Sequence, residues 1–403
     1  MIQINFLGAL STIGASGVLI DTGIERILLD YGTKIQEIPP KFPLQIKGVP
    51  DALLLSHAHL DHSGGIPILF KNSSFPIFSL NVNKELVDLL LLDSIKVSRE
   101  EGVELPFKKK DVRKTVKKFL PVNFRETFKV HKAEITFFNA GHIPGSAMIF
   151  LDFKEKTLVY TGDFNTTEVR LVKKADLDIP NPSILITEST YSDRDHPERK
   201  SQEKELIKTV RETLARDGIC LIAGFAVGRI DEILLILDSY GIDYPVFIDG
   251  MAKKAITIIN KYNNLLKNPK SLDKALEKVE YVKSQKMRKR ILKEPCVILS
   301  TSGMLSGGPI VEYIRRLYSR EDCSLILTSF QLEGTPGKTL LETGRYINEN
   351  INLEIKMNVK RLDFSFHVII ILIGRNLKKS MKISKRFLSF AFILILSFQF
   401  FYI

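Results

Sequence analysis

Residues 57–62 read His-Ala-His-Leu-Asp-His and follow directly on an apolar run, residues 52–56. Imidazole nitrogen and carboxylate oxygen are ligands that Zn²⁺ and similar metals prefer. His57 and His59 are spaced to point at one ion, and Asp61 and His62, past the bend, can reach a second. A polar surface loop with accidental histidines is disfavoured, because three of the 7 histidines fall within six residues. The chain must therefore fold so that a strand ends in a metal-binding loop.

Two downstream turns supply further candidate ligands. His142 lies in a Gly-His-Ile-Pro-Gly turn, and Asp163 follows an apolar run, residues 158–160. A carboxylate has two oxygens and can bridge two cations, so Asp163 is the candidate shared ligand. Asp30 follows the run 26–29 and is expected to orient a ligand histidine through its second ring nitrogen. Each turn taken alone would be an ordinary turn, and only the preceding histidine cluster favours the metal interpretation.

Short apolar runs bounded by turn residues dominate the first 165 residues and predict strands buried between layers. They are residues 17–20, 26–30, 52–56, 134–138, 147–152 and 156–160. The first residues also predict a strand, since they show neither a basic leader nor a cleavage site. Apolar residues at helical spacing predict a helix over residues 84–99.

From about residue 196 the pattern changes to an alternation of helices and strands. Helices are expected over residues 203–216 and 230–239, and strands over residues 220–224, 245–249, 296–300 and 324–328. This alternation is typical of a parallel sheet flanked by helices. A length of 403 residues independently favours two domains.

Cysteine usage and charge limit the cellular location and the partners that we expect for the chain. The 3 cysteines are scattered without C-x-x-C spacing, so a reducing, cytoplasmic location is expected. The net charge is +12, but residues 368–403 hold six basic residues and no acid, which leaves +6 for the rest. That moderately basic body is compatible with a polyanionic partner and is weak evidence for one.

The chain changes character after His367. An apolar stretch and a lysine-rich stretch follow, and residues 387–403 carry no charge. One interpretation is a tail anchor, although seventeen residues is the lower limit for crossing a bilayer. The other, which we favour, is a shifted reading frame, because out-of-frame A/T-rich DNA tends to encode Ile, Phe, Lys and Ser. Membrane association is expected only if the apolar tail is genuine.

The four metal motifs in this order resemble the metallo-β-lactamase superfamily, and the later motifs resemble its β-CASP nucleases. The later motifs are residues 186–191, 224–229, 301–309, 328–338 and 363–367. The similarity runs to His367 and points to archaeal cleavage-and-polyadenylation-factor-like and RNase J-like proteins. It implies an α/β fold, an αββα metallo-β-lactamase sandwich with an inserted α/β β-CASP domain. The implied domains are residues 1–195 for the sandwich, 196–360 for β-CASP, and 361–403 for a return to the sandwich with an aberrant or truncated tail.

The resemblance implies a zinc-dependent ribonuclease that hydrolyses phosphodiester bonds as an endonuclease, a 5′-3′ exonuclease or both, in RNA 3′-end processing or turnover. Two zinc ions per chain are implied. The implied ligands are His57, His59 and His142 for the first ion, Asp61 and His62 for the second, and Asp163 for both. Glu188 would orient His367, which would protonate the leaving oxygen, so the implied catalytic residues are Asp61, Asp163, Glu188 and His367.

RNA is the expected partner, and glycine-rich loops would let backbone N–H groups approach its phosphates. The expected RNA-binding residues are Arg229, Ser302, Gly303, Gly307, Gly308, Gly334 and Lys338. Residues 251–294 hold thirteen basic residues against four acids and are expected to face the polyanion. For the basic run over residues 108–118 two interpretations stay open, an RNA grip and a solvated helix face. Without interleaved aromatic residues, backbone-dominated binding is expected.

One departure from the family concerns the second ion. In the family a further histidine follows the position of His367, and none follows it here. The second zinc site is therefore expected to be weakened, and the sandwich is expected to lack an element. Dimers are common in the family, so a second copy is a further expected partner. The alternative functions are a non-catalytic RNA-binding processing subunit, a DNA-directed β-CASP nuclease, and a small-molecule hydrolase, which the inserted domain disfavours.

Overall fold

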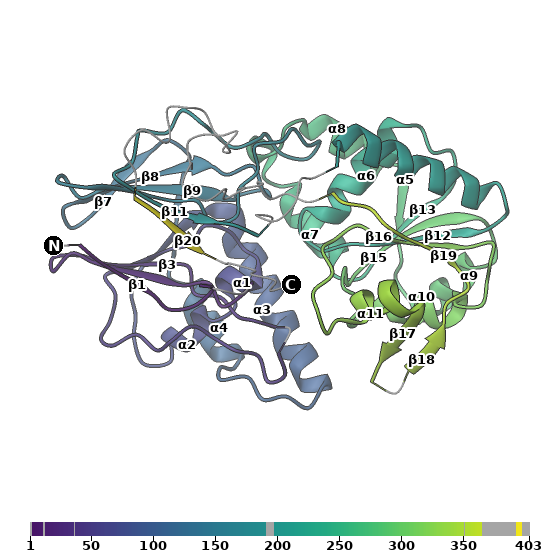
Figure 1. The fold of residues 1–403 in the computed structure, drawn as a ribbon, viewed down its shortest axis with the longest axis horizontal. Coiled ribbons are helices and arrows are strands. Elements are labelled where there is room, and N and C mark those ends of the chain that lie inside the picture. The colour runs from purple at the N-terminus through teal and green to yellow at the C-terminus, as the bar shows by residue number, and fades with distance from the viewer. Residues whose placement is uncertain are drawn as a thin grey trace, which may run out of the picture. The chain divides into compact units, whose positions relative to one another are not determined.

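The computed structural model describes residues 2–10, 13–35, 37–190, 197–349, 351–364 and 392–396 (Figure 1). Its contacts divide the chain into two compact units. Unit 1 takes its described residues from Met1–Glu168, Val172–Asp195 and Phe366–Ile403. Unit 2 takes its described residues from Val169–Leu171 and His196–Ser365.

The first sheet of unit 1 carries the strands that lead into the histidine cluster. Its order is β1-β2-β3-β4-β5-β6, antiparallel from β1 to β3 and parallel from β3 to β6. The strands are β1 (Gln3–Phe6), β2 (Val18–Asp21), β3 (Arg26–Leu29), β4 (Ala52–Leu54), β5 (Ile77–Leu80) and β6 (Phe119–Val122). The helices between β4 and β6 are α1 (Leu60–Ser63), α2 (Ile66–Leu69), α3 (Asn81–Glu100) and α4 (Lys109–Val116).

The second sheet of unit 1 has the order β20-β11-β10-β9-β8-β7. Its strands are β7 (Thr127–Val130), β8 (Ala133–Asn139), β9 (Ala147–Asp152), β10 (Thr157–Tyr160), β11 (Ile184–Glu188) and β20 (Phe392–Leu396). In Figure 1 the two sheets of unit 1 lie one above the other, with α1 to α4 beside the first. Strand β20 runs parallel to β11 at the sheet edge. The expectation that the sandwich lacks an element stays a prediction.

Unit 2 is built on a parallel sheet with the order β14-β13-β15-β12-β16-β19. Its strands are β12 (Ile219–Ala223), β13 (Val246–Asp249), β14 (Val279–Tyr281), β15 (Cys296–Ser300), β16 (Ser324–Leu327) and β19 (Asn358–Arg361). The helices are α5 (Arg199–Leu214), α6 (Arg229–Ser239), α7 (Ala252–Ile259), η1 (Asn263–Leu265), α8 (Pro269–Leu276), α9 (Gln285–Ile291), α10 (Pro309–Leu317) and α11 (Pro336–Thr343). A hairpin, β17 (Arg345–Asn348) and β18 (Ile351–Glu354), completes the unit.

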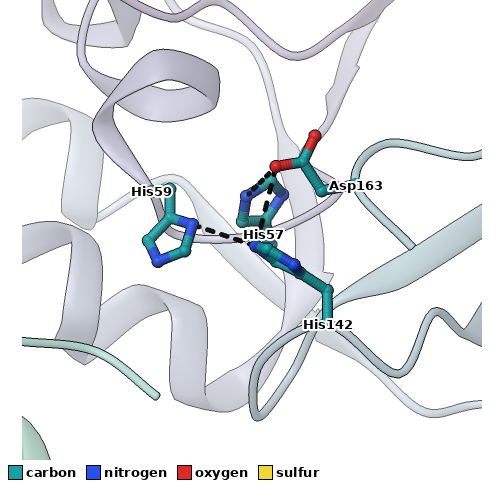
Figure 2. Close-up of side chains that lie close together, drawn as sticks. All are labelled: His57, His59, His142 and Asp163. Carbon is teal, nitrogen blue, oxygen red and sulfur yellow. Dashed lines mark hydrogen bonds and ion pairs between the residues drawn. The ribbon is translucent and has the colours of Figure 1, made fainter. Parts of the chain in front are cut away.

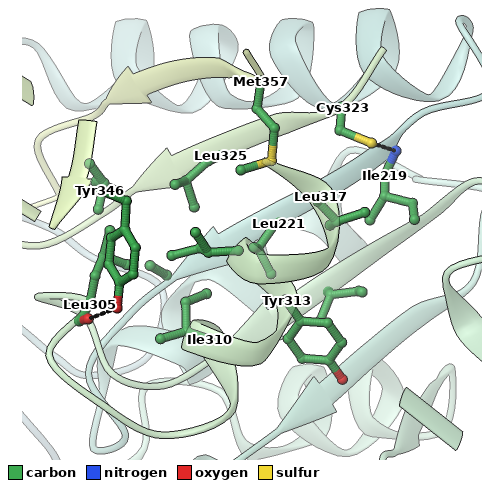
Figure 3. Packing of buried hydrophobic residues seen from close by; sticks show 14 of the residues in the cluster. Ile219, Leu221, Leu305, Ile310, Tyr313, Leu317, Cys323, Leu325, Tyr346 and Met357 are labelled. Atoms are coloured by element: carbon green, nitrogen blue, oxygen red, sulfur yellow. Dashed lines mark hydrogen bonds between the residues drawn. The ribbon is translucent and has the colours of Figure 1, made fainter. Parts of the chain in front are cut away.

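The core of unit 2 explains why its strands read as continuous apolar runs. Every residue of β12 and of β15 is buried, because helices cover both faces of a parallel sheet. On one face Leu221 and Leu325 pack in a cluster with Ile310 and Tyr313 of α10 (Figure 3). Burying one such aliphatic side chain stabilises the fold by roughly 1.5–3 kcal/mol.

A buried carboxylate assigns a short segment before β11 to unit 2. Glu232 of α6 is fully buried and accepts the backbone N–H of Arg170 at 3.0 Å and of Leu171 at 2.7 Å. The Arg199 guanidinium also donates to it. These donors compensate the cost of burying a charge and hold Val169–Leu171 within unit 2.

The predicted α/β fold class is confirmed, including the parallel sheet flanked by helices. The predicted helix over residues 84–99 is α3, which begins three residues earlier. The hairpin β17–β18 was not predicted. Among the described residues no helix is long and apolar enough to cross a membrane. Apart from β20, the altered tail lies outside the described residues, and so do His196 and His367.

The buried Asp231 makes the stability of unit 2 depend on pH. It lies in the first turn of α6, where its Oδ2 accepts the Gly228 N–H at 3.1 Å. Burial raises its pKa to about 7. Between about pH 4 and 7 the Asp231 carboxyl is ionised in the unfolded chain and protonated in the folded chain. Its contribution to the free energy of unfolding therefore falls as the pH rises. The loss amounts to at most about 4 kcal/mol.

We predict that Asp231→Asn removes this dependence. The free energy of unfolding of the variant, minus that of the wild type, should therefore increase between pH 4 and 7 in urea titrations. Asp243→Asn is the matched control, because Asp243 is exposed in the same unit. A stability difference for Asp231→Asn that stays constant across this pH range would contradict the prediction.

Candidate metal centre

The histidine cluster follows β4 and runs into a short helix that the sequence did not indicate. The loop after Leu54 carries His57 and His59, and α1 carries Asp61 and His62. Gly32 permits this arrangement, because a Cβ there would lie 1.6 Å from the carbonyl oxygen of Asp61. The loop after β3 and helix α1 are therefore in direct backbone contact, which brings the end of β3 to the cluster.

The first donor set joins three loops. Ligand atoms of His57, His59, His142 and Asp163 all lie within 4.8 Å of one another (Figure 2). His142 Nε2 lies 3.1 Å from His59 Nδ1 and 3.6 Å from Asp163 Oδ2. His57 Nε2 lies 3.8 Å from the same carboxylate oxygen. All four predicted residues are thus brought together around one point.

The second donor set shares residues with the first. Ligand atoms of His57, Asp61 and His62 also lie within 4.8 Å of one another. His62 Nε2 is 3.9 Å from Asp61 Oδ2 and 3.2 Å from Asp163 Oδ1. One oxygen of Asp163 therefore faces His57 and His142 while the other faces His62. A single carboxylate spans the two sets, as a bridging ligand must.

The chemistry of the donors fits a divalent cation. Within the described part of the chain, the fully buried His57 Nε2 has no hydrogen-bond partner. Burial lowers the pKa of His57 well below its usual value, so its imidazole is neutral, the state that binds metals. Burial opposes protonation of His62, but the charges of Asp163 and Asp61 and hydrogen bonds outweigh it and raise the His62 pKa well above its usual value. A cation would take the place of that proton.

Asp30 lies behind the candidate centre, where an orienting residue was expected. Its carboxylate is fully buried and accepts four hydrogen bonds. Oδ2 lies 2.7 Å from His62 Nδ1, 2.6 Å from Ser56 Oγ and 2.8 Å from the Tyr160 hydroxyl, while Oδ1 accepts the Ser56 N–H at 2.7 Å. Ser56 Oγ also lies 3.0 Å from His57 Nδ1, so one hydroxyl connects Asp30 to both donor sets.

Tyr160, like Ser56, is a residue of this network that sequence reasoning missed. It is the last residue of β10 and is fully buried. Burial and the Asp30 carboxylate raise its pKa well above the usual value, so the hydroxyl stays protonated and donates. In the sequence it looked like the end of an apolar strand, and the only signal was its place three residues before Asp163.

Glu188 lies at the end of β11 and is buried. Its Oε1 accepts the backbone N–H of Phe164 at 3.1 Å, and its Oε2 accepts the Thr190 hydroxyl at 2.7 Å. It therefore fixes the backbone next to Asp163. His367, its predicted partner, lies outside the described residues.

The predicted RNA-binding loops meet at one edge of the unit 2 sheet. They follow β12, β15 and β16, which are adjacent parallel strands. Gln331 Nε2 donates to the Gly303 carbonyl at 2.9 Å, and Gly337 N–H donates to the Met304 carbonyl at 3.0 Å. The loops after β15 and β16 are thus joined to each other.

The individual residues of these loops differ in what they offer. Ser302 and Gly307 bond to each other across the loop, and Gly308 has φ 74°, a left-handed conformation that favours glycine. Arg229 is buried at the start of α6, and a Cβ on Gly334 would meet open space. Lys338 Nζ lies 3.0 Å from both Glu333 and Glu342, so its charge is already compensated.

Comparison with known proteins identifies two family models. The Beta-Casp domain matches residues 230–340, and the anti-Pycsar protein Apyc1 matches residues 4–185. A crystal structure of a protein of unknown function from Enterococcus faecalis V583 superposes with a TM-score of 0.55 at 13% identity. That superposition covers 91% of this chain and 88% of the other, and it shows the fold alone.

Three curated relatives are similar over most of this chain. The probable RNase MJ4 of Methanocaldococcus jannaschii is 36% identical, over 91% of this chain and 87% of that protein. RNase aCSPSF2 of Saccharolobus solfataricus is 33% identical, over 90% of this chain and 74% of that protein. The transcription termination factor FttA of Methanocaldococcus jannaschii is 35% identical, over 84% of this chain but only 57% of that longer protein.

The hydrogen bond from Tyr160 to Asp30 generates a prediction about metal affinity. Tyr160→Phe removes one of the four donors to a buried carboxylate, which loosens the group that orients His62. Loss of such an outer partner weakens metal binding by about 10- to 100-fold. Titration calorimetry with Zn²⁺ should show this loss at one of the binding steps.

Tyr31→Phe is the matched control for that measurement. Tyr31 is buried in the same unit, but its hydroxyl lies 3.3 Å from the Pro43 carbonyl and touches no carboxylate of the centre. Its removal should leave Zn²⁺ affinity unchanged. Equal Zn²⁺ affinity for Tyr160→Phe and Tyr31→Phe would contradict a role of Tyr160 in the centre.

Proposed function

Because the chain belongs to the β-CASP family of the metallo-β-lactamase superfamily, we propose that it is a zinc-dependent ribonuclease. It hydrolyses RNA phosphodiester bonds as an endonuclease, a 5′-3′ exonuclease or both, in RNA 3′-end processing or turnover. The observation that carries the proposal is Asp163, whose two carboxylate oxygens face two different sets of histidines. An arrangement of this kind suits a pair of cations rather than one.

The donor residues have defined tasks in this proposal. His57, His59 and His142 hold the first ion, Asp61 and His62 hold the second, and Asp163 contributes to both. A nitrogen-rich set with carboxylate oxygens suits Zn²⁺. When bound, paired divalent ions activate a water molecule and offset negative charge on the phosphoryl oxygens. Asp30 orients the imidazole of His62, and Ser56 orients that of His57, for metal binding.

Proton delivery to the leaving oxygen is assigned to Glu188 and His367. Glu188 is buried at the end of β11. One of its carboxylate oxygens accepts the Phe164 N–H and the other accepts the Thr190 hydroxyl, so Glu188 lies beside the backbone that follows Asp163. A carboxylate held in this way can orient an imidazole by accepting its N–H. His367 would then donate its other proton to the leaving group.

The loops of unit 2 position the RNA backbone. Gly307 and Gly334 face open space and leave room for phosphates near backbone N–H groups, with Ser302 as a hydroxyl donor. Gly303 and Gly308 instead allow the loops to pack closely against neighbouring atoms. Arg229 supplies a positive charge at the same sheet edge. Lys338 contributes little, because two glutamates already share its charge. This mode of binding reads phosphates rather than bases.

The first test is cleavage of end-labelled RNA and DNA by the wild type and by Asp61→Ala combined with His62→Ala. The double variant lacks ligands of the second ion, so RNA cleavage should fall at least about 100-fold. The control is Asp51→Asn combined with His131→Ala, a partly exposed His–Asp pair 3.2 Å apart in the same unit. Equal cleavage by wild type and the Asp61/His62 variant would remove the enzyme interpretation, and faster cleavage of DNA would favour the DNA-directed alternative.

The second test counts metal ions. The first position is surrounded by ligand atoms of four residues, three of them histidines, whereas the second is surrounded by those of three residues, His57, Asp61 and His62. We therefore expect one zinc per chain to survive dialysis and a second to be lost, as measured by mass spectrometry of the metal. Two zinc ions retained equally well would refute the weakened second site.

A further inference from the structure

The surface of α4 concentrates positive charge on unit 1. Every Lys and Arg from Lys108 to Lys118, seven in all, is exposed, and we call this set the α4 basic surface. The one acid of the stretch, Asp111, is buried and accepts the Lys108 backbone N–H at 3.0 Å. The inner face, Asp111, Val112 and Thr115, is buried, and α4 packs on α2 and α3. The helix thus turns its one acid inward, with Val112 and Thr115, and presents its basic residues outward.

These charges have no carboxylate partners. Among residues that the structure describes, none of the seven forms an ion pair, and Lys114 Nζ reaches only the carbonyl of Lys71, another exposed basic residue. The partly buried Asp88 on α3 interacts electrostatically with Arg113 but forms no ion pair with it. The surface is therefore strongly positive, with only weak compensation from neighbouring acids.

The basic stretch over residues 251–294 differs in this respect. Lys253 and Arg288 pair with Asp249, Lys278 pairs with Asp238, and Arg290 pairs with Glu280. Several of its charges therefore serve the fold of unit 2. The α4 basic surface differs from this stretch in that none of its seven charges pairs with an acid among the described residues.

Leaving this surface bare carries a cost in free energy. Lys109 and Arg113, and Lys110 and Lys114, stand four residues apart on one helix, where like charges cost about 0.2–0.5 kcal/mol per pair. Lys109 and Lys110 also lie in the first turn, where the helix dipole disfavours positive charge. A solvated helix face gains nothing from this arrangement, since alternating charges would keep it equally soluble. A bound polyanion offsets both the repulsion between the like charges and their unfavourable interaction with the helix dipole.

The α4 basic surface is distinct from the metal centre. The Ile77 N–H at the start of β5 donates to the carbonyl of Lys118 at 2.9 Å, so Lys118 lies at the amino end of the parallel strands. His57 follows the carboxyl end of β4, which is parallel to β5. Lys118, the last residue of the α4 basic surface, and His57 are therefore at opposite ends of the parallel strands.

We propose that the α4 basic surface binds the phosphate backbone of RNA and tethers the substrate outside the metal centre. The inference rests on the proposed function for the identity of the polyanion. Single-stranded RNA fits, because seven closely spaced ammonium and guanidinium groups bind charge and not sequence when the flanking aromatic residues, Phe107 and Phe119, are buried. An acidic protein segment is the other polyanion that the charge alone would accept, and the test distinguishes the two.

The test measures binding of a labelled, hydrolysis-resistant phosphorothioate RNA of about 30 nucleotides to the full chain across a salt series. The variant is Lys110→Gln, Lys114→Gln and Lys117→Gln, which keeps helix-forming residues. Losing three phosphate contacts should weaken Kd at least about 10-fold at low salt and make the salt slope shallower by about two. Turnover at saturating cleavable RNA should stay at the wild-type kcat, which shows that the variant is folded.

The matched control is Lys129→Gln, Lys132→Gln and Lys156→Gln, which removes the same charge from exposed positions of unit 1. Its salt slope should remain close to that of the wild type. RNA binding by the wild type with the same slope in both triple variants would overturn this proposal alone. Absence of RNA binding by the wild type would overturn it together with the proposed function. Loss of poly-glutamate binding with RNA binding intact would assign the surface to an acidic protein and would likewise overturn it.

Discussion

The buried carboxylate of Asp30 is the constraint on which the metal centre depends. A charge removed from water costs several kcal/mol unless hydrogen bonds replace its hydration. Asp30 meets that requirement only if the ends of β3 and β10, the loop after β4 and helix α1 converge on it. The same convergence aims His62 and, through Ser56, His57 at one point. The fold of unit 1 and the geometry of its metal-ligand donors therefore depend on the same hydrogen bonds.

Much of this centre could be predicted from the sequence, because its donors are unusual residues in unusual places. Clustered histidines after an apolar run, and a Gly-Asp after another, indicate strand ends that carry ligands. Tyr160 escaped prediction, since a tyrosine at the end of a buried strand looks like core until the position of Asp30 is known. Helix α1 escaped too, because four residues are too few to show helical periodicity.

Charge in this protein has to be judged by its partners and not by its abundance. A count along the sequence cannot tell lysines that pair with acids, such as Lys253 and Lys278, from the unpaired ones on α4. Lys338 was predicted as a phosphate contact, yet Glu333 and Glu342 lie on either side of it in sequence and share its charge. Those glutamates were visible, but their approach depends on the start of α11 at Pro336, which the sequence left undefined. Similarly, the assignment of Val169–Leu171 to unit 2 depends on Glu232, sixty residues away.

Both units use the same physical device to build a site. In unit 1, the candidate ligands after β4 and the orienting Asp30 after β3 follow parallel strands at their carboxyl ends. In unit 2, the glycine-rich loops follow the carboxyl ends of β12, β15 and β16. Parallel strands send all their carboxyl ends to one edge, so side chains distant in sequence meet there without any strand having to bend. The strands supply rigidity and the loops supply chemistry, which explains why the motifs of this chain recur at strand ends and why the α4 basic surface, at an amino edge, is free for a different task.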